Sequence, residues 1–168
     1  MRRGARRRTH ETTGVHIMAD DGIRAAIRDS SSDATVADLS SDTPDDARYL
    51  FTQTAGGMGV NLDGRITLHG IGSDTRWFSD RPYRMTGTVT TQVFVSEWSR
   101  GADNFAENPP NAVVAMNNED GVDELVVVLE DPRLDGDDLS YAVTVLDGRL
   151  LPGEGSVAVF IDGRTTPG

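Results

Sequence analysis

From Ala47 onward, short apolar runs alternate with clusters of glycine, proline, asparagine and aspartate. In Tyr141–Val145 every second position is apolar and the others are small or polar, as in a strand with one wet face. Such runs, bounded by turn-forming residues, predict β-strands. Eight strands are expected, over Tyr49–Thr54, Arg65–His69, Arg76–Ser79, Tyr83–Val89, Ala112–Met116, Leu125–Glu130, Leu139–Leu146 and Ser156–Ile161.

The run Leu125–Leu129 contains no polar position, which predicts a central strand covered on both faces. One segment breaks the β pattern. Over Thr91–Arg100, Thr91 offers an N-cap, Phe94 and Trp98 lie four residues apart on one helical face, and Gly101 follows as a stop. This segment predicts one short helix across an open end of the β structure, with its aromatic residues packed inward.

The predicted fold class is therefore all-β, a mainly antiparallel β-sandwich or partly open barrel with one short α-helix. With 168 residues and 37% hydrophobic residues, the chain has room for a single domain with a real core. The expected core comprises Tyr49, Phe51, Ile66, Leu68, Trp77, Val89, Phe94, Trp98, Val113, Val126, Val128, Tyr141, Val143, Val145, Val159 and Ile161.

The N-terminal residues 1–46 predict a disordered leader ahead of a single β-rich domain over residues 47–168. Residues 18–46 contain eight aspartates, two arginines and few large apolar residues, too little apolar surface to offset the entropy of ordering. Only a short helical turn over Ile23–Ile27 is expected there. Residues 1–17 carry five arginines without the apolar stretch of an export signal, and they are either a basic tail or untranslated sequence upstream of Met18.

The composition narrows the classes of function. The chain has no cysteine, which removes disulfides, thiolate nucleophiles and cysteine-based metal sites. A net charge of −11 argues against nucleic acid and anionic membranes as partners, and no apolar run is long enough to insert into a membrane. A soluble, cytoplasmic protein is the default expectation, with an extracytoplasmic location left open. The basic residues are all arginine, a bias that fits either GC-rich coding or salt adaptation.

Four motifs occur in order: FSDRP (residues 78–82), PPNA (109–112), DPRLDGDDLSYAV (131–143) and FID (160–162). With these motifs the sequence resembles an uncharacterised bacterial domain family of unknown function. The resemblance covers roughly residues 49–162. It implies a shared fold and brings no activity, cofactor or catalytic residue with it.

Two of these motifs hold candidate ligand-binding residues. Arg81 could present its guanidinium to an anion beside Asp80, or the motif could be a turn in which Asp80 accepts backbone N–H groups. Asn111 ends a proline-rich connection that could bind a partner or only link two elements. With the helix between them, these loops form the expected contact surface, and its candidate ligand-binding residues are Asp80, Arg81, Trp98 and Asn111.

The acidic stretch of the third motif is a candidate metal site. Four carboxylates within eight residues could hold Ca²⁺, although the late bidentate glutamate of an EF-hand loop is missing. The alternative is a solvated turn that closes a hairpin. The candidate ligands are Asp131, Asp135, Asp137 and Asp138.

Enzyme chemistry finds little support in the sequence. His69 is the single histidine after the leader, and a triad with Ser79 and Asp80 would lack the nucleophile-elbow sequence. No catalytic residue is assigned. The first hypothesis is a non-enzymatic binding or structural module. The alternatives are a small hydrolase or isomerase that uses carboxylates such as Glu97 and Glu107 in a cleft, and a Ca²⁺-stabilised domain.

Overall fold

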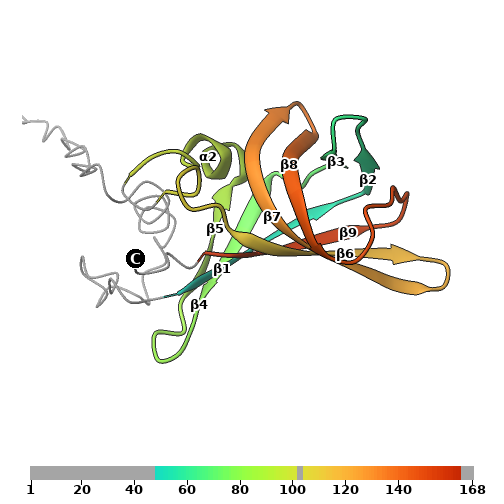
Figure 1. Ribbon diagram of the computed structural model, residues 1–168. Helices are drawn as coiled ribbons and strands as arrows, with labels where there is room; N and C mark the ends of the chain where they lie inside the picture. Colours follow the sequence, from blue (N-terminus) through green and yellow to red (C-terminus); the bar gives the residue numbers. More distant parts are fainter. Residues whose placement is uncertain (1–47, 102–103, 164–168) are drawn as a thin grey trace, which may run out of the picture.

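The computed structural model of the protein describes residues 48–101 and 104–163. The expectations for residues 1–46, including the translation start and the helical turn over residues 23–27, lie outside these ranges. The described part of the chain folds into nine strands and one short helix (Figure 1). The elements are β1 (Tyr49–Ala55), β2 (Gly57–Val60), β3 (Arg65–His69), β4 (Asp74–Ser79), β5 (Thr86–Thr90), α2 (Thr91–Ser96), β6 (Asn111–Asn118), β7 (Gly121–Asp135), β8 (Asp138–Asp147) and β9 (Val157–Asp162).

All nine strands belong to one sheet, in the order β2-β3-β8-β7-β6-β9-β1-β4-β5. Every pair of neighbouring strands is antiparallel. The expected all-β fold with one short helix is confirmed. The separate sheets of a sandwich are not present in the described residues, whereas a single sheet that does not close is compatible with the expected partly open barrel.

The sheet curls around its own core. Tyr141 on β8 and Gln53 on β1 lie four strands apart in the sheet order, which is about 19 Å across a flat sheet. Their side chains nevertheless form a hydrogen bond of 2.8 Å. One face of the sheet is therefore folded inward onto itself, and the opposite face points away from the core.

The helix α2 is shorter than expected and begins differently. Thr90, rather than Thr91, is the N-cap, and its hydroxyl accepts from the backbone N–H of Val93. Thr91, which directly follows β5, is buried. Its hydroxyl donates a hydrogen bond to the carbonyl of Gly72. Phe94 and Trp98 are buried as predicted. In the described residues no helix has the length and apolar character needed to cross a membrane.

On the neighbouring strands β6 and β7, the residues that point into the core differ from those expected. Val113, Val126 and Val128 are only half-buried, because the inward positions on β6 and β7 are the alternate ones. In β8, Tyr141 is the last buried residue along the strand. Val143 is half-buried and Val145 is exposed. The inward residues of β6 and β7 are Ala112, Val114, Met116, Leu125, Val127 and Leu129.

One strand lies outside the eight expected ranges. The glycine-rich stretch around Gly57–Val60 forms β2, which pairs with β3 along its whole length. Met58 on this strand is buried, and the ring of His69 packs so closely over Gly59 that an added Cβ would lie 2.9 Å from Nε2. A side chain at Gly59 would therefore displace the exposed His69 ring, and the stretch is a paired strand.

Candidate functional site

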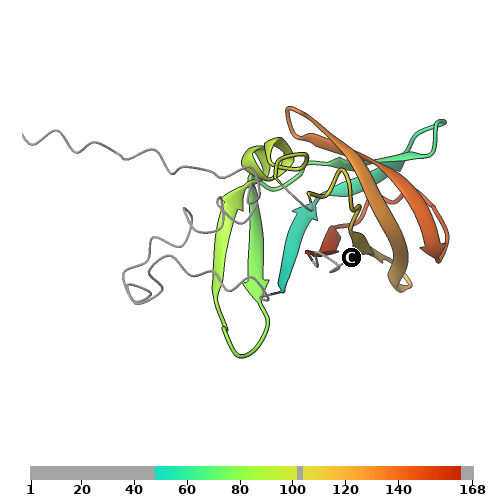
Figure 2. The ribbon, with the colours of Figure 1, turned by 60° about the vertical axis from the view of Figure 1, so that its left-hand side comes forward.

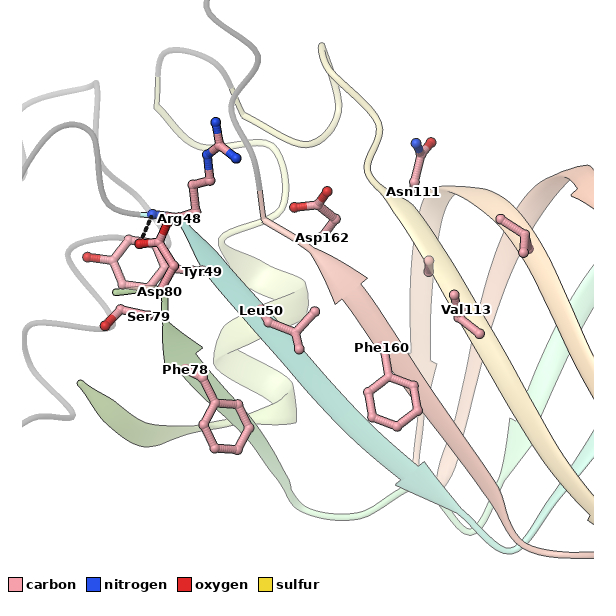
Figure 3. Close-up of a pocket in the computed structure, with 12 residues that line it drawn as sticks. Arg48, Tyr49, Leu50, Phe78, Ser79, Asp80, Asn111, Val113, Phe160 and Asp162 are labelled. Atoms are coloured by element: carbon pink, nitrogen blue, oxygen red, sulfur yellow. Dashed lines mark hydrogen bonds between the residues drawn. The ribbon is translucent and has the colours of Figure 1, made fainter. Parts of the chain in front are cut away.

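A groove lies on the outward face of the sheet, over β4, β1, β9 and β6, and it reaches Val126 on β7 (Figure 3). Its volume is about 710 Å³. The lining residues are Arg48, Tyr49, Leu50, Phe78, Ser79, Asp80, Asn111, Ala112, Val113, Val126, Phe160 and Asp162.

The floor of this groove is apolar and exposed. Figure 3 shows Phe78, Leu50, Phe160 and Val113 projecting from four neighbouring strands toward one side. Phe78 stands directly opposite Leu50, and Phe160 stands opposite Val113. Phe78, Leu50 and Phe160 expose 44%, 41% and 39% of their surface. Large apolar side chains of this kind, gathered on adjacent strands, are typical of an interaction surface.

The rim of the groove at one end is polar. Asp80 accepts a hydrogen bond from the backbone N–H of Arg48 at 3.3 Å, and its own N–H donates to the carbonyl of Arg48 at 3.0 Å. These bonds tie the start of β1 to the turn after β4. Asp162 lines the same groove beside Asn111. The rim therefore presents two carboxylates and one guanidinium, all contributed by strand ends.

The FSDRP motif forms the connection between β4 and β5. The carbonyl of Asp80 accepts from the N–H groups of Tyr83 and Arg84, and Ser79 pairs with Met85 through both backbone and hydroxyl. Arg84 has a positive φ of 48°, which fits a tight turn. The turn interpretation of this motif thus describes its local structure, while Phe78 and Asp80 still face the groove.

The four candidate ligand-binding residues divide between two places. Asp80 and Asn111 line the groove, although they are 31 positions apart in the sequence. Arg81 is exposed on the hairpin turn and does not line it. Trp98 is only 4% exposed and packs against Phe105 and Tyr141 in the aromatic core. Trp98 is therefore a core residue, as expected from its helical spacing, and it does not line the groove.

The sequence analysis missed the apolar floor. The signal was present: Phe78 follows the inward Trp77, and Phe160 sits between the inward residues Val159 and Ile161. In a strand, neighbours point to opposite faces, so adjacent large apolar residues imply apolar surface on both faces. Only the pairing of β4, β1 and β9 places these outward residues together.

The four candidate metal ligands are not gathered into a site. Asp131 accepts hydrogen bonds from Arg65 and Arg133, and Asp135 pairs with Asp138 across a two-residue turn that begins with Gly136 at φ 58°. In the described ranges no group of three or more histidine or acidic residues is placed to hold a metal ion. The stretch closes the β7–β8 hairpin, because the strands continue almost to the turn.

We expect Ca²⁺ to leave the melting temperature of the protein unchanged. Asp131 is already neutralised by two arginines, and the other carboxylates do not converge, so the folded state offers no preferential binding. Thermal unfolding with millimolar CaCl₂ and with EDTA checks this, and MgCl₂ at equal ionic strength is the control. A rise in melting temperature that is specific to Ca²⁺ would contradict it.

The residues considered for catalysis are also dispersed. His69 pairs with Asp138, at 3.0 Å between Nδ1 and Oδ1, and not with Asp80. Glu107 is exposed in the loop after Phe105, and Glu97 is buried with one oxygen bonded to Arg100. Neither Glu97 nor Glu107 lines the groove, whereas Asp80 does.

Comparison of the chain with models of protein families, with characterised proteins and with solved structures finds no match. The resemblance to a bacterial domain family therefore stays a prediction from its motifs. The functional argument rests on the groove alone.

Proposed function

We propose that the protein is a non-enzymatic binding module whose outward groove takes an apolar segment of a partner protein. The observation that carries this proposal is the exposure of Leu50, Phe78 and Phe160 on three adjacent strands. Burying such side chains against a partner yields about 25 cal/mol per Å² of apolar surface, and large apolar residues act as anchors at interfaces.

The charge of the rim selects among apolar partners. Asp80 and Asp162 outnumber Arg48 along the groove, and the whole chain carries a net charge of −11. A cationic partner is attracted by this field and an anionic one is repelled. The segment we propose therefore has apolar side chains with lysine or arginine beside them.

Replacing the three floor residues together, as Leu50→Thr, Phe78→Thr and Phe160→Thr, is expected to remove binding and keep the fold. Threonine suits a strand, and these side chains are partly in water, so each change should cost about 1 kcal/mol or less in stability. Truncating three anchors should weaken the partner at least about a hundredfold. Peptides selected from a displayed random library on the wild-type protein serve as the probe, with affinities measured by calorimetry.

Leu146→Thr is the matched control, because Leu146 is 53% exposed on β8 and does not line the groove. The selected peptides should combine apolar and basic residues and bind this control like the wild type. Asp80→Asn should lower their affinity and flatten its dependence on salt. The proposal fails if the selected peptides bind the triple variant as tightly as the wild type.

A further inference from the structure

The strand β5 ends the sheet and leaves part of its backbone without a neighbouring strand. Figure 2 shows the β4–β5 hairpin at one margin of the sheet, with β5 beyond β4. Thr91 N–H donates to Ser73, and Ser79 N–H donates to Met85. Because hydrogen-bonding direction alternates along an antiparallel strand, odd-numbered positions face β4 and the backbone groups of Thr86 and Thr88 face outward.

The opposite margin of the sheet is covered. In β2, Met58 exchanges two backbone hydrogen bonds with Gly153, at 2.8 and 2.9 Å. No described segment pairs with the outer side of β5 in this way. Within residues 48–101 and 104–163 the two ends of the sheet therefore differ, and β5 offers the open edge.

This open edge lacks the features that discourage strand pairing. Edge strands are commonly protected by charged side chains, prolines or bulges. The sequence of β5 is Thr-Gly-Thr-Val-Thr, without charge or proline, and its pairing with β4 runs without a register shift. Gly87 lies over the ring of Trp77, where an added Cβ would be 2.7 Å from Cζ2, so the backbone of β5 packs closely on a buried side chain.

The strand is also complementary to itself. A twofold axis through Thr88 would set Thr88 opposite Thr88 of a second copy and Thr86 opposite its Thr90, in a ladder of threonine pairs. Threonine pairs are favourable cross-strand neighbours, and a neutral strand opposes no like charges. In this arrangement the outward N–H of each Thr88 would donate to the outward C=O of the other Thr88.

We propose that two copies of the chain associate through antiparallel pairing of β5 with β5, with Thr88 on the twofold axis. The interface is isologous and leaves the groove over β4, β1 and β9 open in each copy. A five-residue strand pair is a small interface, and the net charge of −11 on each copy opposes it. The dimer should therefore be weak, and salt should strengthen it.

Sedimentation velocity of the full chain tests this, from roughly 10 µM to 1 mM, at low salt and at about 0.5 M salt. We expect the average mass to rise with concentration, and the rise to begin at lower concentration in high salt. A mass that stays monomeric throughout the range would overturn the proposal.

Two variants with opposite charges at position 88 test whether the dimer forms through β5. Thr88→Lys and Thr88→Asp each place like charges opposite each other on the axis, so each variant alone should stay monomeric. An equimolar mixture should regain the dimer, because lysine then faces aspartate. Thr144→Lys is the control, since Thr144 is exposed on β8, away from this edge. Its average mass should depend on concentration as that of the wild type does.

Two results would overturn the assignment of the edge. A dimer that persists in Thr88→Lys places the interface elsewhere, and a mixture that stays monomeric excludes Thr88 from the axis. The triple variant of the groove separates this proposal from the function proposed above. It should dimerise like the wild type, whereas loss of its dimer would mean that a second copy occupies the groove.

Discussion

Gln53→Leu is expected to lower the free energy of unfolding by about 3 kcal/mol, because it breaks a buried chain of hydrogen bonds. Gln53 accepts from the Tyr141 hydroxyl at 2.8 Å, and its amide donates to the Thr75 hydroxyl at 3.1 Å. Thr75 lies 3.2 Å from the Thr91 hydroxyl, which donates to a backbone carbonyl. Leucine would leave a buried hydroxyl donor and a buried acceptor without their partner.

The protonation of Tyr141 adds to this expectation. Burial raises the pKa of its hydroxyl above the ordinary value, with the Gln53 hydrogen bond acting in the opposite direction. The hydroxyl therefore stays protonated and must find an acceptor. Gln53 on β1 is that acceptor, which makes this bond a tie between the two halves of the curled sheet.

Urea unfolding of the Gln53→Leu variant measures the loss, and Gln92→Leu is the matched control because Gln92 is exposed on α2. The control should change stability by less than about 0.5 kcal/mol. Tyr141→Phe combined with Gln53→Leu should cost less than the sum of the two, since the second change removes the group that the first leaves unpaired. Additive losses, or a Gln53 variant as stable as the control, would contradict the role of this network.

Arg65→Met is expected to destabilise the protein by about 3 kcal/mol, since it removes four hydrogen bonds made by a largely buried guanidinium. Its side chain is 9% exposed. From β3, the guanidinium reaches residues on β7 and β8. Nη1 donates to the Asp131 carboxylate at 2.9 Å, and Nη2 donates to the Asp131 carbonyl at 2.6 Å and to Ser140. This arginine bridges the irregularity in β7 where the register with β8 shifts between Glu130 and Arg133.

Arg133→Met provides a control at the same carboxylate. Arg133 also donates to Asp131, at 2.8 Å, but its side chain is 67% exposed. An exposed ion pair contributes little, so this change should cost less than about 1 kcal/mol. Arg65→Lys should fall between the two, because an ammonium keeps the charge and loses the planar fork. Equal losses for Arg65→Met and Arg133→Met in urea unfolding would refute the distinction.

Much of the fold class follows from local sequence. Short runs with period two, separated by glycine, proline and aspartate, predicted eight of the nine strands in the described residues. The four-residue spacing of Phe94 and Trp98 predicted the short helix and its buried side. These signals are local, because a strand or a turn depends on a few consecutive residues.

The candidate site could be predicted only in part. Asp80 and Asn111 stand out in their motifs, and both reach the groove. Trp98 was expected both in the core and at the contact surface, and the structure confirms its place in the core. Helical spacing alone does not say what covers the face.

The sequence by itself determined that the described part of the protein is mainly β, where most of its strands lie and where the short helix α2 lies. Only the tertiary structure decided which face of β6 and β7 is buried, because an unbroken run such as Leu125–Leu129 satisfies either phase. It also decided that β8 lies against β1 across the core, and that Leu50, Phe78 and Phe160 meet in one groove. Both depend on strand pairing between residues far apart in the chain, which no local pattern encodes.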